Sequence, residues 1–147
     1  MADRLGLKEA RAIVDAMLEE AAGRGLKFAA AVVDAGGDLI HLSRSDGASA
    51  LNARMSHHKA YTAVKWQQDT KRIKERLFSM SLGDARRDIA WFGDPLYTPV
   101  WGGILLRSGD GTVLGAIGES GGTPEQDEEI GQIGAAVFAG LCRMELP

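Results

Sequence analysis

The chain lacks the features that mark several common classes of protein. Its 147 residues include one cysteine, Cys142, so an intrachain disulfide and a cysteine-rich zinc site are excluded. The sequence contains no long apolar run, and the N-terminal segment carries charges at Asp3 and Arg4 where a signal peptide would have an apolar core. We therefore expect no membrane partner and a cytoplasmic location.

Charge and nucleotide motifs are equally sparse. The formal net charge of −3 gives no reason to expect nucleic acid as a partner. No glycine-rich nucleotide fingerprint or P-loop is present, so NAD-dependent redox chemistry and phosphoryl transfer are not expected.

Helix and hairpin signals alternate along the chain. Apolar spacing predicts helices over 8–22, about 48–68, 70–80 and from 124 onward, where Thr123 and Gln126 form a capping box. Apolar runs at 27–34 and 39–44 flank a Gly36-Gly37 turn, and a second pair at 101–108 and 113–120 flanks the turn 109–112. Because hairpins pair their strands antiparallel, these signals predict a single α+β domain over residues 1–147.

Two adjacent histidines lie in the predicted helix 48–68. Helical spacing puts His57 on a stripe with Ala53, Ala60 and Val64, which predicts that it faces the sheet or a pocket beside it. His57 can then be a packed core residue, a catalytic or ligand-contacting group, or a ligand of a metal or haem. His58 shares a face with polar residues and is expected nearer the surface; neighbours on a helix point about 100° apart, so the two do not suit one metal ion.

A second set of candidates is charged. Glu119 ends a predicted strand, where it is either exposed or, if buried, a general acid or base with a raised pKa. Lys59 could bind a substrate carboxylate or pair with Asp34 or Glu119. Gly121 and Gly122 precede a helix whose free N–H groups favour an anion.

Aromatic residues gather in and beside the segment 81–100, which is long for a connection and typical of a lid or binding loop. They are Trp91, Phe92, Tyr97 and Trp101. Core packing, a pocket lid and an oligomer interface all remain open for them. Tyr61 and Trp66 favour packing or an interface, and Arg44 flanks the end of the second predicted strand.

Three segments carry a resemblance to a known family: VVDAGGDLIHLSRSDGA, KAYTA and GDGTVLGAIGESGGTPEQDEEI. Together they resemble the GlcG/HbpS-like haem-binding family, which includes the C-terminal domain of PduO-type corrinoid adenosyltransferases, over roughly residues 5–142. The resemblance implies a profilin-like fold, with an antiparallel sheet of about five strands flanked by helices. It also implies a homo-oligomer, from dimer to octamer, a small-molecule ligand and a place in a catabolic gene cluster.

The residues support a haem-binding protein, a small enzyme or a non-catalytic ligand-binding protein. With haem as the candidate cofactor, His57 is the axial ligand, with His58 or Tyr61 behind it. The enzyme would be an isomerase, lyase or hydrolase that uses His57 and Glu119 as acid and base, with Lys59, on a small carboxylated compound. Buried charges need partners, so Glu119 and Lys59 favour a polar ligand over haem. We predict a small-molecule-binding protein, whose further contact residues are His58, Tyr61, Arg44, Gly121, Gly122, Trp91 and Trp101.

Overall fold

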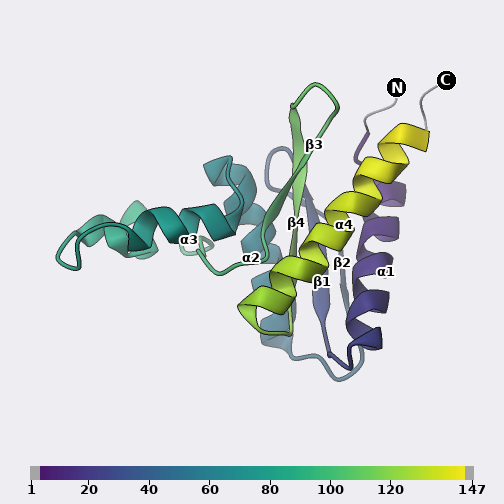
Figure 1. The fold of residues 1–147 in the computed structure, drawn as a ribbon, viewed down its shortest axis with the longest axis horizontal. Coiled ribbons are helices and arrows are strands. Elements are labelled where there is room, and N and C mark those ends of the chain that lie inside the picture. The colour runs from purple at the N-terminus through teal and green to yellow at the C-terminus, as the bar shows by residue number, and fades with distance from the viewer. Residues whose placement is uncertain (1–3, 145–147) are drawn as a thin grey trace.

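A computed structural model describes residues 4–144, which form an α+β domain (Figure 1). The elements along the chain are α1 (Leu7–Gly23), β1 (Ala29–Asp34), β2 (Leu39–Arg44), α2 (Ala50–Trp66), α3 (Thr70–Phe78), the short 3-10 helices η1 (Ala85–Arg87) and η2 (Ile89–Phe92), β3 (Ile104–Arg107), β4 (Val113–Ser120) and α4 (Pro124–Met144). Both predicted hairpins and all four predicted helices are therefore present.

The sheet is antiparallel throughout, in the order β2-β1-β4-β3. The expected number of about five strands is corrected to four within the described residues. Residues 101–103 do not extend β3, because Gly102 adopts a φ of 124° and Gly103 bonds to Thr70 instead of to β4. β4 consequently runs three residues past its last pairing with β3, at Ile117, and one edge of its end is left without a strand.

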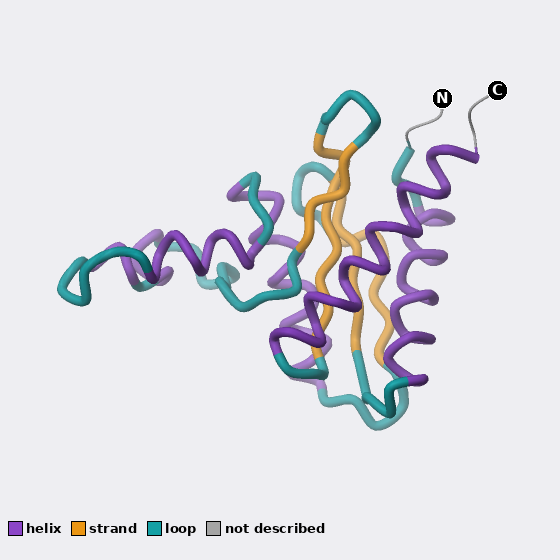
Figure 2. Tube along the Cα trace, viewed as in Figure 1, coloured by secondary structure: helices purple, strands orange, loops and turns teal. Residues whose placement is uncertain are grey.

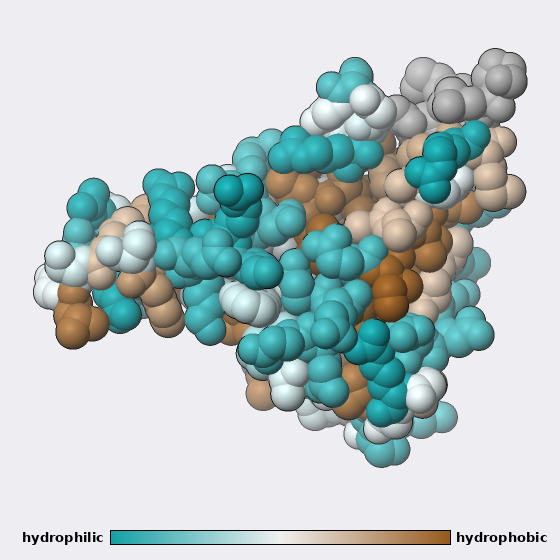
Figure 3. Space-filling model, in the orientation of Figure 1, coloured by the Kyte–Doolittle hydropathy of each residue, from teal (hydrophilic) through white to brown (hydrophobic). Residues whose placement is uncertain are grey.

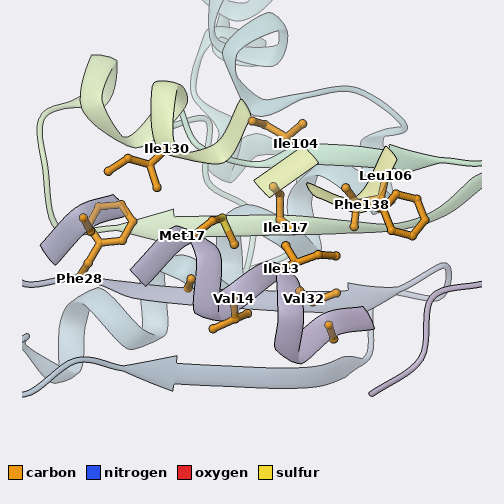
Figure 4. Close-up of a cluster of buried hydrophobic side chains, with 13 residues drawn as sticks. Ile13, Val14, Met17, Phe28, Val32, Ile104, Leu106, Ile117, Ile130 and Phe138 are labelled. Carbon is orange, nitrogen blue, oxygen red and sulfur yellow. The ribbon is translucent and has the colours of Figure 1, made fainter. Parts of the chain in front are cut away.

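Helices α1 and α4 cover one face of the sheet and enclose the main core (Figure 4). Its fully buried side chains include Ile13 and Met17 of α1, Ile117 of β4 and Ile130 of α4. In Figure 4 these side chains point toward one another between the helices and the sheet. Apolar burial on this scale is the dominant stabilising contribution to the fold.

Helix α2 covers the opposite face and lies very close to β4. A Cβ placed on Gly118 would come within 2.0 Å of the Ser56 carbonyl oxygen and 2.6 Å of the Ala60 nitrogen. Only glycine leaves room for this backbone contact, and the contact fixes the position of α2 on the sheet.

The segment 70–92, which contains α3, η1 and η2, projects away from the sheet as an arm (Figures 1 and 2). Its Ile73 and Leu77 are fully buried, but it also carries exposed apolar side chains at Phe78, Leu82 and Trp91. Figure 3 shows apolar atoms at the tip of this otherwise polar arm. Across residues 4–144 no helix combines the length and the apolar character needed to cross a membrane.

Candidate functional site

Helix α2 sorts the candidate residues onto two faces. Its inner face consists of Ser56, Lys59, Ala60 and Ala63, all of them buried at the helical spacing of i, i+3, i+4 and i+7. Of the two positions predicted for His57, the one facing the sheet is therefore taken by these residues, and a pocket beside the sheet stays a prediction. His57 lies beside that inner face and is half-buried, because Gly118 draws Ser56 and Ala60 onto the sheet.

The inner face holds a buried ion pair that is built around Lys59. Its ammonium donates to the Glu119 backbone oxygen at 2.7 Å and to the Asp127 carboxylate at 2.9 Å. The oxygen belongs to the end of β4 that β3 leaves uncovered, and Asp127 belongs to the first turns of α4. Lys59 therefore ties the two sides of the sheet together, and its partner is Asp127, not Asp34 or the Glu119 carboxylate.

The Glu119 side chain is fully buried among close neighbours. An ideal Cβ on Gly131 would lie 2.4 Å from its Oε1, and one on Gly102 would lie 2.9 Å from it. Neither carboxylate oxygen has a hydrogen-bond partner in residues 4–144. Burial, opposed by Lys59 and reinforced by Asp127 and Glu128, raises the pKa of Glu119 well above its usual value. Burial in this position therefore favours the neutral form of the Glu119 carboxyl group over its charged form.

The structure does not bring His57 and Glu119 together. The Glu119 carboxyl group lies against Gly131 of α4 on the α1/α4 face of the sheet, whereas His57 belongs to α2 on the other face. A proton-transfer pair needs hydrogen-bond distance or one bridging water, so the predicted acid–base pair has no geometric support.

The predicted anion site at Gly121 and Gly122 is filled by the protein's own carboxylate. The Gly122 N–H donates to Asp127 Oδ1 at 2.9 Å, and the Thr123 N–H donates to Gln126 Oε1. Gly121 is required for a different reason: its φ of 146° is one that side chains disfavour, and a Cβ would collide with the Lys27 carbonyl oxygen. These donors are therefore capping groups of α4.

A continuous series of aromatic rings begins on the outer face of α2 and extends to residues 91–97. We call this series the ring ladder. Successive rings have centroids 4.7 to 6.5 Å apart, within the range of favourable ring contacts. In order they are His58, His57, Tyr61, Tyr97, Trp66, Phe92 and Trp91. The ladder therefore runs from two histidines on α2 to Trp91 of η2, which is 57% exposed.

Cations and a cavity border the ladder. Lys65 Nζ lies 5.5 Å from the centre of the Tyr61 ring, and the Arg76 guanidinium lies 5.9 Å from that of Trp66. A cavity of about 300 Å³ opens between these two cations, lined by Lys65, Trp66, Arg76, Phe92 and Tyr97. The surface thus combines flat apolar area with positive charge.

Hydrogen bonding and burial shift the pKa values of the ladder's polar members. The Tyr61 hydroxyl donates to Asp94 at 2.6 Å, and this bond raises the pKa of Tyr61 to about 12 and lowers that of Asp94. Burial, together with the charges of His57 and Arg54, lowers the pKa of His58. At neutral pH Tyr61 is therefore a phenol, and His58 is a neutral imidazole that can ligate a metal.

The remaining predicted contact residues lie elsewhere. Trp101 is stacked under Lys71 and its buried Nε1 has no partner in the described part of the chain, while Arg44 is exposed at the end of the edge strand β2. His41 bonds to Ser43 on β2. Within residues 4–144 no group of three or more histidine, cysteine, aspartate or glutamate side chains could hold a metal ion.

The sequence did not point to Asp127, Asp94, Lys65 or Arg76 as site residues. Asp127 and Lys59 are 68 positions apart on elements that cover opposite faces of the sheet, so no local spacing links them. Asp94 is next to Pro95 in the irregular segment before β3, where periodicity carries no signal. The one available hint was the concentration of aromatic residues in 91–101.

The fold and these two faces define a small profilin-like α+β domain with one tightly packed and one half-exposed surface on α2. The family of the haem-degrading protein HbpS matches residues 5–136. Protein GlcG of Escherichia coli K12 is 36% identical over 135 residues, which are 92% of this chain and 95% of GlcG. The chain therefore belongs to the HbpS-like family.

Solved structures agree with this assignment. The Klebsiella pneumoniae protein ORFY has a TM-score of 0.83 at 26% identity, over 92% of this chain and 90% of ORFY. A structure described as the PduOC:heme complex has a TM-score of 0.81 at 26% identity, over 90% and 94% of the two chains.

Proposed function

We propose that this protein binds haem on the outer face of α2, where His57 would hold the iron and His58 is the neighbouring imidazole. The observation that carries the proposal is the ring ladder, which joins both histidines to a cavity bordered by Lys65 and Arg76. A porphyrin offers a flat apolar face, an iron that takes imidazole and two carboxylates that take cations. The haem complex of the structural neighbour PduOC supports the same ligand.

The residues of the outer face fit this group better than those of the inner face. Tyr61 is a poor iron ligand because its hydroxyl proton is held by Asp94 and its pKa is raised to about 12. An imidazole needs only to be neutral, and the lowered pKa of His58 favours the neutral form of this neighbour of His57. Bound haem would supply iron chemistry; the chain's residues would supply ligation, stacking on Tyr97 and Trp66, and charge for the propionates.

Haemin titration followed by absorbance tests the proposal. We expect the wild type to give a stoichiometric Soret shift, and His57→Ala to lose most of it. His41→Ala is the matched control, because His41 lies on β2 and belongs to no part of the ladder. Equal spectra for wild type and a His57→Ala/His58→Ala double variant would refute ligation by this helix.

The proposed homo-oligomer is supported by the arm. Its residues 70–92 include six basic and three acidic side chains, a net charge of +3 in a chain of −3. The arm of one copy therefore complements the net acidic body of another, and its exposed Phe78 and Leu82 would be covered there. Light scattering after size exclusion should show an oligomer that Leu82→Asp weakens; a monomer at all concentrations would refute it.

A further inference from the structure

A second cavity lies at the free edge of the sheet, away from the ring ladder. It measures about 370 Å³ and is lined by Gln67, Gln68, Asp69, Arg72, Leu105 and Arg107. None of these residues lines the cavity beside the ladder. Its walls come from the α2–α3 junction and from β3, the edge strand, so it is open to solvent.

Two guanidinium groups from different elements face this cavity. Arg107 of β3 gives one N–H to the Gly111 carbonyl oxygen at 3.0 Å and keeps its other N–H groups available. No hydrogen bond or ion pair occupies the Arg72 side chain within residues 4–144. Paired guanidiniums offer the forked donor geometry that suits a carboxylate.

The α2–α3 junction also supplies acceptors to this cavity. Asp69 receives the Leu105 N–H on one carboxylate oxygen at 2.9 Å, which holds the second oxygen in place. The Gln68 carboxamide oxygen is buried and has no partner in the described part of the chain. A buried acceptor without a donor is costly, so a ligand that donates a hydrogen bond here would relieve that cost.

We propose that this cavity binds a small organic carboxylate that also carries a hydroxyl or amino group. The carboxylate would bind Arg72 and Arg107, the donor would bind the Gln68 oxygen, and the carbon skeleton would lie on Leu105. The side chains of Arg72 and Arg107 carry two positive charges and that of Asp69 one negative charge, so the lining has one excess positive charge. This matches the single negative charge of a hydroxy acid. The volume is near the lower end of the range for ligand pockets, roughly 300–1,000 Å³, and so suits a small molecule.

Titration calorimetry with glycerate, L-serine, acetate and inorganic phosphate tests this site. We expect glycerate or serine to bind more tightly than acetate, and Arg72→Gln and Arg107→Gln each to weaken that binding at least about tenfold. Gln68→Leu should remove the preference over acetate. Lys74→Gln is the matched control: it removes a positive charge from the same helix but from neither cavity.

Three results would overturn the proposal: no binding of any of the four probes, binding that neither arginine variant changes, or phosphate and acetate binding as tightly as glycerate and serine in both wild type and Gln68→Leu. Because haem binding would depend on different residues, failure here leaves the Soret titration unaffected. Circular dichroism of each variant confirms that its fold is intact.

Discussion

The two faces of helix α2 carry similar kinds of polar residue in very different surroundings. On the inner face, Lys59 is 1% exposed and donates hydrogen bonds to Glu119 and Asp127. The helix lies so close to β4 here that position 118 has room only for glycine. On the outer face, His57, His58 and Tyr61 are half-buried, and a cavity opens farther along the ladder. Buried charge without a cavity holds the fold together, whereas half-exposed rings with a cavity can meet a ligand.

Removing Lys59 should have the largest effect on stability. Lys59→Met would leave the Asp127 carboxylate buried without its cation and the Glu119 carbonyl without its donor, and breaking a buried pair from one side costs about 3–5 kcal/mol. Urea unfolding measures the loss. Lys65→Met on the exposed outer face is the control, and an equal loss in both variants would contradict the distinction between the faces.

The pH dependence of stability should reveal the raised pKa of Glu119. In the folded protein Glu119 keeps its carboxyl proton at pH values where the same group in the unfolded chain, with a pKa near 4.5, has released it. Stability present at low pH is therefore lost as the pH rises above that value, by up to about 1.4 kcal/mol per unit. Glu119→Gln carries no such proton, so its stability relative to wild type should increase from pH 5 to pH 8. Parallel curves would show that Glu119 ionises normally.

Gly131 gives a smaller test of the packing around Glu119. Gly131→Ala places a methyl group 2.4 Å from Glu119 Oε1 and 2.6 Å from Ile104, which should destabilise the fold by about 1–3 kcal/mol. Gly140→Ala on the same helix has its nearest neighbour at 3.9 Å and should be neutral or stabilising by up to about 1 kcal/mol. Thermal unfolding measures the stability of both variants. Equal melting temperatures for Gly131→Ala and Gly140→Ala would contradict the close packing around Glu119.

Tyr61 should contribute least to the fold. Tyr61→Phe removes the hydrogen bond to Asp94, for an expected cost of about 1 kcal/mol on a half-buried surface. The ring remains, so haem binding should persist. Chemical unfolding measures the first effect and haemin titration the second; a loss of several kcal/mol would place Tyr61 with the structural residues of the inner face.

Local patterns predicted most of the fold. The capping box is confirmed, with Gln126 N–H donating to Thr123 Oγ1 and Gln126 Oε1 accepting from the Thr123 N–H. Apolar spacing and turn glycines located all four α-helices and both hairpins because these signals act over a few residues, but they did not predict the short helices η1 and η2. The strand count of about five came from the family resemblance, whereas the two hairpins predicted from the residues supply the four strands that residues 4–144 contain.

The site was less predictable because its partners meet only in three dimensions. Helical spacing gave several possible stripes on α2, and the choice between His57 and Lys59 as the inward residue depends on where Gly118 meets the helix. The face on which the Glu119 side chain lies follows from the register of β4 with β1, which pairs Glu119 with Ala30. Neither fact can be read from spacing within one element.

The most direct test of the central claim is the Soret spectrum of the His57→Ala/His58→Ala double variant with one equivalent of haemin, beside that of Lys59→Met measured where it remains folded. If the outer face of α2 binds haem, the double variant should lose the ligated spectrum and Lys59→Met should keep it. A double variant with the wild-type spectrum would contradict the account.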